Sequence, residues 1–268
     1  MFDIGIDIGS TATKVAVIEG ARESDGENGT SGEPSIAHTW ICPTGFSSVD
    51  AADRVREHLD SIGALADAHA VVATGYGRVA VPFADKSITE ITCHGKGAAL
   101  LFGPDGVTID VGGQDTKVIQ LAGGAVKKFV MNDKCAAGTG RFLEIMADRL
   151  AVSQSDLADL ARGARPASIS SMCTVFAESE VISLIGRGEP REEIAAGVIE
   201  SVVGRVATLA SGMAADRYFL TGGLCDNEYI VQRLAARLEK PVATEPRARF
   251  AGAIGAALAA RDLKKKKK

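Results

Sequence analysis

The sequence is poor in the residues on which nucleic-acid recognition most often depends. Aromatic residues make up 5% of the 268 residues, with a single tryptophan, and the formal net charge is −4 at pH 7. Nucleic-acid-binding proteins stack aromatic rings on bases and contact phosphates with clustered lysine and arginine side chains. The composition therefore argues against a nucleic-acid partner, and we interpret the one basic run, at 264–268, as a solvated tail.

Long apolar runs are also missing. No stretch approaches the roughly 18 consecutive apolar residues that a membrane-spanning helix requires, and the N-terminal residues lack the cationic start of a signal peptide. We therefore expect no membrane partner and a cytoplasmic location. Five cysteines in a reducing compartment are expected to be free, so any cysteine with a function binds metal or reacts. Cys42, Cys93 and Cys225 share no sequence context and are expected to fill small buried spaces.

Two segments, 2–20 and 107–124, follow the same plan of an apolar strand, a glycine turn and a second apolar strand, which predicts two β-hairpins. Three pairs of residues share an offset of 103 positions: Asp7 and Asp110, Gly9 and Gly112, and Lys14 and Lys117. A constant offset indicates an internal duplication.

The turns of both hairpins suit a bound phosphate. Glycines at 9, 112 and 113 let backbone N–H groups approach phosphate oxygens, and nearby hydroxyl groups add donors: Ser10, Thr11, Thr13 and Thr116. Asp7 and Asp110 end their strands, where a carboxylate holds magnesium through the waters of the ion. Together the two loops predict a polyphosphate site.

A third glycine pair, Gly222–Gly223, lies between an apolar strand and a helix with apolar residues at Ile230, Leu234 and Leu238. Such a turn can lie against an adenosine, although any tight strand-to-helix turn favours glycine. The order of two phosphate loops and an adenosine loop resembles the ATPase superfold of actin, sugar kinases and heat-shock chaperones. The chain contains no GxxxxGK[ST] motif, which disfavours a P-loop NTPase.

This resemblance implies an α/β fold of two ribonuclease-H-like domains with the nucleotide cleft between them. The first domain would comprise residues 1–105, with 248–263 as a C-terminal helix packing back on it. The second would comprise residues 106–247.

Two further cysteines, Cys135 and Cys173, do share a context, because each precedes a stretch with helical apolar spacing. The apolar positions are Phe142, Leu143, Ile145, Met146 and Leu150 after the first, and Val175, Phe176, Val181, Ile182 and Ile185 after the second. Each thiolate is therefore expected at a helix N-terminus, which stabilises negative charge. Zinc and iron–sulfur sites commonly take four ligands, so a second copy of the chain would complete a four-thiolate site. Two buried cysteines or a redox-sensing pair remain alternatives.

The chain carries, in this order, GIDIGSTATK, TGYGR, ITEITCHGKGA, IDVGGQDTK, NDKCAAGTGRFLE, CTVFAESEVISLI and TGGL. This series resembles the ATP-dependent activators of 2-hydroxyacyl-CoA dehydratases, a family that includes the ATPase subunits of benzoyl-CoA reductases. The resemblance implies an ATPase that passes a low-potential electron from ferredoxin or flavodoxin to such a dehydratase or reductase under anaerobic conditions. It also implies a homodimer with one shared 4Fe–4S cluster, and ATP or ADP with Mg in each subunit.

The same resemblance implies a role for individual residues. Cys135 and Cys173 of both subunits would hold the cluster, and Gln114 would position the attacking water, beside the carboxylates of Asp7 and Asp110. The nucleotide would contact Ser10, Thr11, Ala12, Thr13 and Lys14 in the first loop, Gly112, Gly113 and Gln114 in the second, and Gly222 and Gly223 in the third.

Three features depart from the family pattern. Residues 20–35 have the composition of a mobile insertion, Arg249 stands where a smaller polar residue is expected, and the lysine run has no family counterpart. Two other functions remain open: a small-molecule kinase, for which we find no aspartate to act as the base, and a nucleotide-switched scaffold.

Overall fold

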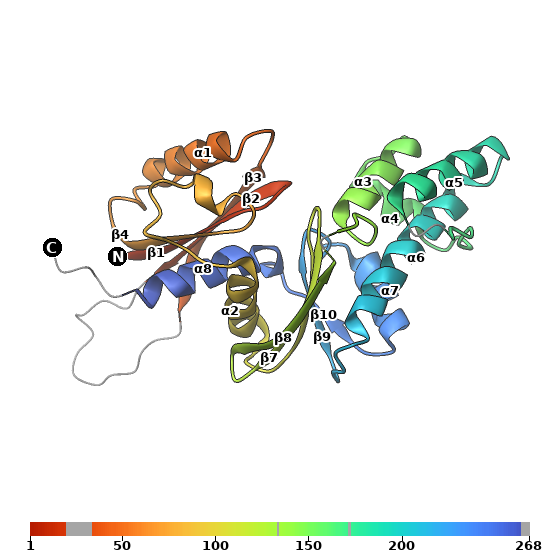
Figure 1. Ribbon diagram of the computed structural model, residues 1–268. Helices are drawn as coiled ribbons and strands as arrows, with labels where there is room; N and C mark the ends of the chain where they lie inside the picture. The colour runs from red at the N-terminus through yellow and green to blue at the C-terminus, as the bar shows by residue number, and fades with distance from the viewer. Residues whose placement is uncertain (20–33, 133, 171–172, 264–268) are drawn as a thin grey trace. The chain divides into compact units, whose positions relative to one another are not determined.

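The computed structural model of the chain describes residues 1–19, 34–132, 134–170 and 173–263 (Figure 1). The lysine run at 264–268 and nearly all of the expected insertion at 20–35 lie outside these residues. The chain divides into two compact units. The first draws on Met1–Pro104, Gly123–Val126 and Phe250–Lys268, and the second on Asp105–Ala122 and Lys127–Arg249.

The first unit is built on a five-stranded sheet with the strand order β3-β2-β1-β4-β5. Its strands are β1 (Phe2–Ile8), β2 (Ala12–Glu19), β3 (Ser35–Pro43), β4 (Ala68–Thr74) and β5 (Lys86–Ser87). Its helices are α1 (Ser48–Ser61), η1 (Arg78–Ala80), α2 (Glu90–Phe102) and α8 (Ala251–Arg261). β1 to β3 form an antiparallel meander, and β4 joins β1 in parallel. The predicted hairpin at 2–20 is confirmed by the pairing of β1 with β2.

The two faces of this sheet are covered differently because the side chains of β1 alternate. Ile4, Ile6 and Ile8 pack with the apolar face of α1. On the other side, a Cβ at Gly5 would overlap the backbone of α8 at Ala253, so this glycine lets the helix approach β1 closely. Figure 1 shows α1 on one side of the sheet and α8 on the other. The Asp3 and Asp7 side chains therefore share their face of the sheet with Gly5.

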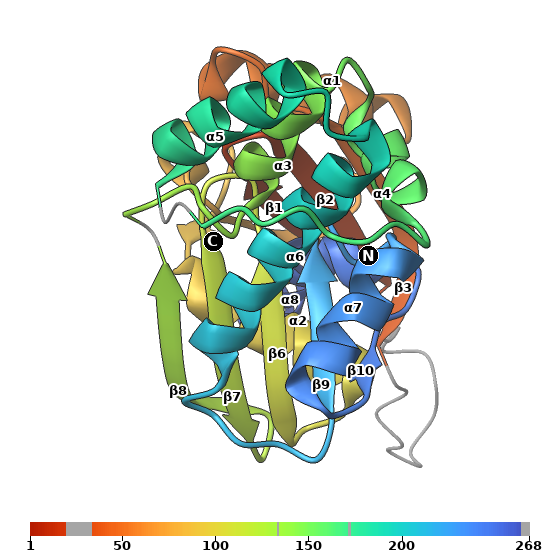
Figure 2. The same cartoon turned by 90° about the vertical axis from the view of Figure 1, so that its right-hand side faces the viewer.

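The second unit contains a sheet with the strand order β10-β9-β6-β7-β8. Its strands are β6 (Gly106–Val111), β7 (Thr116–Ala122), β8 (Ala125–Asn132), β9 (Tyr218–Gly222) and β10 (Val242–Ala243). Its helices are α3 (Gly140–Arg149), α4 (Gln154–Ala161), α5 (Thr174–Gly186), α6 (Arg191–Ala210), α7 (Glu228–Leu238) and η2 (Ala248–Phe250). The apolar α6 packs against β7 and, in Figure 2, crosses the sheet alongside α7.

The two sheets repeat one topology. β6 pairs antiparallel with β7 and parallel with β9, as β1 pairs antiparallel with β2 and parallel with β4. The register matches as well, since Asp7 lies opposite Lys14 and Asp110 lies opposite Lys117. The second hairpin and the internal duplication are thus confirmed. Among the described residues, no helix has both the length and the apolar character needed to span a membrane.

Candidate functional site

The first predicted phosphate loop is the tight turn that joins β1 to β2. The Gly9 amide donates to the Ala12 carbonyl oxygen at 3.2 Å, which closes the turn and leaves Ser10 and Thr11 exposed at its tip. Ala12 and Lys14 are half-buried on β2. A turn of this kind presents exposed hydroxyl groups and backbone amides to a bound anion.

Thr13 lies beneath this loop. Its hydroxyl is fully buried and sits 2.9 Å from the hydroxyl of Thr44, which in turn donates to the Gly9 carbonyl oxygen at 2.8 Å. The Arg54 guanidinium donates to the carbonyl oxygens of Pro43 and Thr44 and so holds the neighbouring segment in place. Thr13 therefore shapes the loop from below.

The second predicted phosphate loop closes in the same way. The Gly112 amide donates to the Asp115 carbonyl oxygen at 2.9 Å, and Gln114 is exposed at the tip. The difference lies in the charges, because Lys117 is only 1% exposed and its Nζ lies 2.6 Å from Asp115 and 3.7 Å from Asp110. Asp110 also accepts a 2.8 Å hydrogen bond from the hydroxyl of Thr221. The carboxylate of Asp110 is thereby held in place by a buried cation and a hydroxyl.

The third loop follows β9. Gly222 has a φ of +86°, and a Cβ there would overlap the carbonyl oxygen of Val111, while the Gly223 amide donates to that same oxygen at 3.0 Å. These two glycines therefore fasten the end of β9 to the second phosphate loop, and Gly223 is exposed.

The first unit has an equivalent of this third loop that sequence reasoning missed. β4 ends at Thr74, opposite Asp7, just as Thr221 lies opposite Asp110. Gly75 has a φ of +85°, and the Gly77 amide donates to the Ile8 carbonyl oxygen at 2.9 Å. The sequence signal for this loop was the Thr–Gly pair that TGYG at 74–77 shares with TGGL at 221–224. The duplication thus includes a glycine turn behind each phosphate loop.

Arg249 forms an ion pair of 2.9 Å with Asp226, just after the third loop. Asp226 also accepts from the thiol of Cys225 at 3.2 Å. Burial and the neighbouring Asp226 charge raise the pKa of Cys225 to about 12, so this thiol stays protonated. Cys93 and Cys225 are buried as expected, whereas the expectation fails for Cys42, which is half-buried on the edge strand β3.

Cys173 and Cys135 differ in their relation to the helices that follow them. Cys173 is the N-cap of α5 and is exposed, which confirms the expected helix N-terminus. For Cys135 the expectation is wrong, because α3 begins only at Gly140 and its N-cap is Thr139. Gly138 has a φ of +87°, so the intervening residues form a turn before the helix starts.

This turn, which we call the cysteine loop (residues 134–139), is tied to β7 and β8. The side-chain amide of Asn132 donates to the carbonyl oxygens of Cys135 and Ala137, at 2.9 and 3.0 Å. The buried Thr116 hydroxyl, expected to contact phosphate, instead donates to the Gly138 carbonyl oxygen at 2.7 Å. Cys135 thus occupies a loop whose backbone is fixed by two side chains.

The N-terminus of α3 is bonded directly to the second phosphate loop. The amides of Gly140 and Arg141 donate to the carbonyl oxygens of Gly112 and Gly113, both at 2.9 Å. The predicted phosphate loop and the predicted cysteine site are therefore consecutive parts of one hydrogen-bonded structure, a relationship that sequence spacing alone did not reveal.

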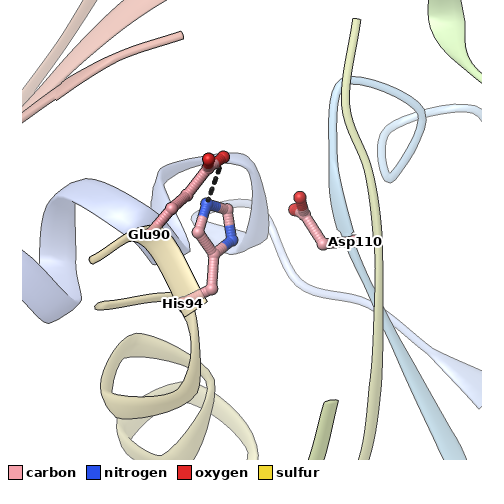
Figure 3. A group of neighbouring side chains, drawn as sticks. All are labelled: Glu90, His94 and Asp110. Atoms are coloured by element: carbon pink, nitrogen blue, oxygen red, sulfur yellow. Dashed lines mark ion pairs between the residues drawn. The ribbon is translucent and has the colours of Figure 1, made fainter. Parts of the chain in front are cut away.

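A further polar contact, between Asp7 and His94 in the first unit, was also missed by sequence reasoning. His94, on α2, is 3% exposed, and its Nε2 lies 3.9 Å from Asp7 and 3.7 Å from Glu90. Figure 3 shows the His94 ring turned toward the Glu90 carboxylate. The spacing of Glu90 and His94, one helical turn apart within ITEITCHGKGA, was the available signal.

Comparison with known proteins extends these observations. A model of the BadF/BadG/BcrA/BcrD ATPase family matches residues 4–260. The (R)-2-hydroxyglutaryl-CoA dehydratase activating ATPase of Acidaminococcus fermentans is 40% identical over 263 residues, which are 96% of this chain and 96% of that protein. The solved activator of the 2-hydroxyisocaproyl-CoA dehydratase from Clostridium difficile with bound ADPNP is 37% identical, with a TM-score of 0.86 over 98% of this chain and 95% of that one.

A more distant likeness bears on the fold alone. The ROK family glucokinase from Streptomyces griseus, in complex with glucose and AMPPNP, aligns over 98% of this chain and 100% of its own with a TM-score of 0.59 at 15% identity. The α/β superfold expected from the order of the loops is thus confirmed. Since the family model and the dehydratase activators match nearly the whole chain, the protein belongs to the BadF/BadG/BcrA/BcrD ATPase family.

Proposed function

We propose that this chain is an ATP-hydrolysing iron–sulfur protein that transfers a low-potential electron to a partner acyl-CoA dehydratase or reductase. The observation that carries the proposal is the pair of hydrogen bonds from the start of α3 to Gly112 and Gly113. These bonds connect the loop that suits phosphate to the loop that holds Cys135. The names of two close relatives, as activators of acyl-CoA dehydratases, support the same reading.

The nucleotide site in this proposal uses the three glycine loops. ATP or ADP would contact Ser10, Thr11, Ala12 and Lys14 in the first loop, whereas the buried Thr13, expected to contact the nucleotide, supports this loop from below. The further contacts would be Gly112, Gly113 and Gln114, and finally Gly222 and Gly223. The donors fit a polyphosphate, because the tips of both phosphate loops are exposed and their glycines allow close approach of the backbone. Gln114 would orient the attacking water, and the buried carboxylates of Asp7 and Asp110 would hold Mg through its waters.

The loops that would sense the phosphate also explain how its loss reaches Cys135. When the tip of this loop, at Gly113 and Gln114, binds the terminal phosphate, the carbonyl oxygens of Gly112 and Gly113 remain bonded to the amides of Gly140 and Arg141. A shift of the loop on hydrolysis therefore moves the first turn of α3 and the cysteine loop in front of it.

The cysteines fit an iron–sulfur cluster in type but not in number. Cys135 and Cys173 offer two thiols in each chain, and a 4Fe–4S cluster takes four. We therefore propose a homodimer in which both chains contribute their two cysteines. The cluster would supply a site for one electron, and the N-terminus of α5 at Cys173 would stabilise its negative charge.

The surface of α5 supports a second copy of the chain as the missing partner. Four of its apolar side chains are exposed: Val175 at 66%, Phe176 at 68%, Ile182 at 51% and Ile185 at 43%. Only the opposite side of the helix is buried, at Ala177, Val181 and Leu184. An apolar stripe that starts beside Cys173 favours an isologous interface around the cysteines. We further propose ferredoxin or flavodoxin as electron donor, and a cytoplasmic, anaerobic setting.

Anaerobic purification tests the proposal. We expect one 4Fe–4S cluster for every two chains by iron and sulfide analysis, a dimeric mass in solution, and ATP-dependent reduction of an acyl-CoA dehydratase. Cys135→Ser should lose the iron and the electron transfer, whereas Cys42→Ser, a change at a half-buried cysteine on β3, should keep both. Iron-free protein in which both cysteines are intact and reduced would contradict the proposal.

A further inference from the structure

The Asp7 carboxylate lies close to a buried histidine of the first unit, outside the three glycine loops. Asp7 is 2% exposed at the end of β1, and His94, 3% exposed on α2, faces it with an Nε2–Oδ2 distance of 3.9 Å. Glu90 lies one helical turn before His94, and its Oε1 is 3.7 Å from the same Nε2 (Figure 3). One ring nitrogen of His94 thus lies within ion-pair distance of two carboxylates.

The equivalent carboxylate in the second unit has different partners. Asp110 is accompanied by the buried Lys117 at 3.7 Å and by the hydroxyl of Thr221 at 2.8 Å. At the matching positions of the first unit stand Lys14, which is half-buried, and Thr74, whose hydroxyl donates to the Ile88 carbonyl oxygen instead. Both units thus keep the aspartate at the end of the first strand, and in the first unit His94 lies beside it.

A glycine on helix α8 leaves room for the Asp7 and His94 side chains. A Cβ at Gly252 would lie 2.6 Å from Oδ2 of Asp7 and 2.7 Å from Nε2 of His94, so any larger residue would displace one of them. A strand, a helix and a glycine of a third element thus converge on the Asp7–His94 pair. Burying a carboxylate and an imidazole costs folding free energy, which favours a functional role for the Asp7–His94 pair.

We propose that His94, backed by Glu90, is a positioning residue that fixes the Asp7 carboxylate for ATP hydrolysis. In this proposal the imidazole ring orients the Asp7 carboxylate toward the water shell of the nucleotide-bound magnesium. Glu90 in turn fixes the ring. This inference rests on the proposed role of Asp7 in ATP hydrolysis and adds the residues that orient it.

The test is steady-state ATP hydrolysis by His94→Ala, measured together with the Kd of a fluorescent ATP analogue with and without Mg²⁺. Loss of a group that orients a metal-site carboxylate typically lowers activity or metal affinity by about 10- to 100-fold. We expect kcat to fall by that factor. We also expect Mg²⁺ to lower the Kd of the analogue less in His94→Ala than in the wild type. Binding of the analogue without Mg²⁺ should stay at the wild-type level. Restoring a polar group of similar reach with His94→Gln should recover most of the kcat.

The chain offers a matched control on the same strand. Asp3, near the opposite end of β1, is paired with His69 at 2.8 Å, and His69→Ala removes an Asp–His contact far along the strand from the glycine turn. We expect this variant to keep the wild-type kcat and Mg²⁺ dependence.

Three results would overturn the inference. The first is a wild-type kcat in His94→Ala, and the second is an equal loss of kcat in His69→Ala, which would point to general weakening of β1. The third is a loss in His94→Ala that His94→Gln does not relieve. Wild-type protein that binds ATP with Mg²⁺ yet never hydrolyses it would instead overturn the proposed function, and with it this inference.

Discussion

The backbone amide of Gly140 donates a hydrogen bond of 2.9 Å to the carbonyl oxygen of Gly112. Gly140 is the first residue of α3, and Gly112 belongs to the second predicted phosphate loop. This bond joins the backbones of the two segments directly, without a side chain between them. Thr116 reinforces the connection with its hydroxyl bond to Gly138.

Thr116→Val should therefore weaken the connection. The change preserves the shape of the side chain but leaves the buried Gly138 carbonyl oxygen without its 2.7 Å donor. An unsatisfied buried acceptor costs about 1–3 kcal/mol in the free energy of unfolding, which urea denaturation measures. The matched control is Thr108→Val on β6, because the buried Thr108 hydroxyl has no hydrogen-bond partner among the described residues. Thr108→Val should be neutral or stabilising, and an equal loss in both variants would contradict the prediction.

Lys117→Met should be among the most destabilising single changes in the second unit. The Lys117 ammonium is 1% exposed and faces both Asp110 and Asp115, so its removal leaves buried negative charge without its cation. Breaking a buried ion pair from one side costs about 3–5 kcal/mol of unfolding free energy. Lys14→Met, at the equivalent but half-buried position, should cost about 1 kcal/mol or less. Similar midpoints of urea unfolding for the two variants would refute this assignment.

Local sequence patterns predicted the parts of the fold that depend on neighbouring residues. Alternating apolar residues gave both hairpins, and the constant offset gave the duplicated register of Asp7 with Lys14 and Asp110 with Lys117. The start of α5 followed from the apolar spacing after Cys173. The start of α3 did not, because the left-handed Gly138 extends the cysteine loop by several residues before the helix begins.

The contacts that join distant segments could not be predicted from one sequence. The bonds from α3 to the second phosphate loop, and the approach of His94 to Asp7, both depend on how elements pack in three dimensions. The exposure of Val175 and Phe176 could not be predicted either, because helical spacing alone does not tell which apolar face of α5 is buried. Spacing identified the candidate residues, whereas packing determined how they are connected.

The stability of the first unit should decline as the pH falls below about 6.5, the ordinary pKa of histidine. Burial, together with the nearby His38, lowers the pKa of His58 in the folded chain. The Nε2 atoms of His38 and His58 lie 2.9 Å apart. The Trp40 ring stacks on the His58 ring, with 4.2 Å between the ring centroids. Because the unfolded chain then binds the proton more readily, the stabilisation is full above pH 6.5 and is lost as the pH falls through the lowered pKa.

Replacing His58 tests this assignment. Thermal unfolding followed between pH 5 and 8 should show a flatter pH dependence for His58→Gln than for the wild type. Glu57→Gln, a change at an exposed neighbour on α1, should leave the slope between pH 6 and 7 unchanged. A wild-type slope in His58→Gln would show that another group is responsible.

Two adjacent glycines should separate folding from nucleotide binding. Gly222 has a φ of +86° and no room for a Cβ beside the Val111 carbonyl oxygen, so Gly222→Ala combines backbone strain with a steric overlap. Strain of this kind costs about 1–3 kcal/mol on its own, and we expect the free energy of unfolding to fall by at least that amount. Gly223→Ala meets nothing within 4 Å and should leave the stability unchanged.

The affinity for an ATP analogue then distinguishes a structural glycine from a binding one. If the exposed backbone at Gly223 lies against the adenosine, the methyl group of Gly223→Ala should reduce analogue affinity about tenfold while the urea midpoint stays at the wild-type value, a loss of about 1.4 kcal/mol in binding alone. Gly222→Ala should lose stability and affinity together, because the end of β9 detaches from Val111. Unchanged analogue affinity in Gly223→Ala would remove this loop from the nucleotide site and leave Gly222–Gly223 as a turn required only for packing β9 against β6.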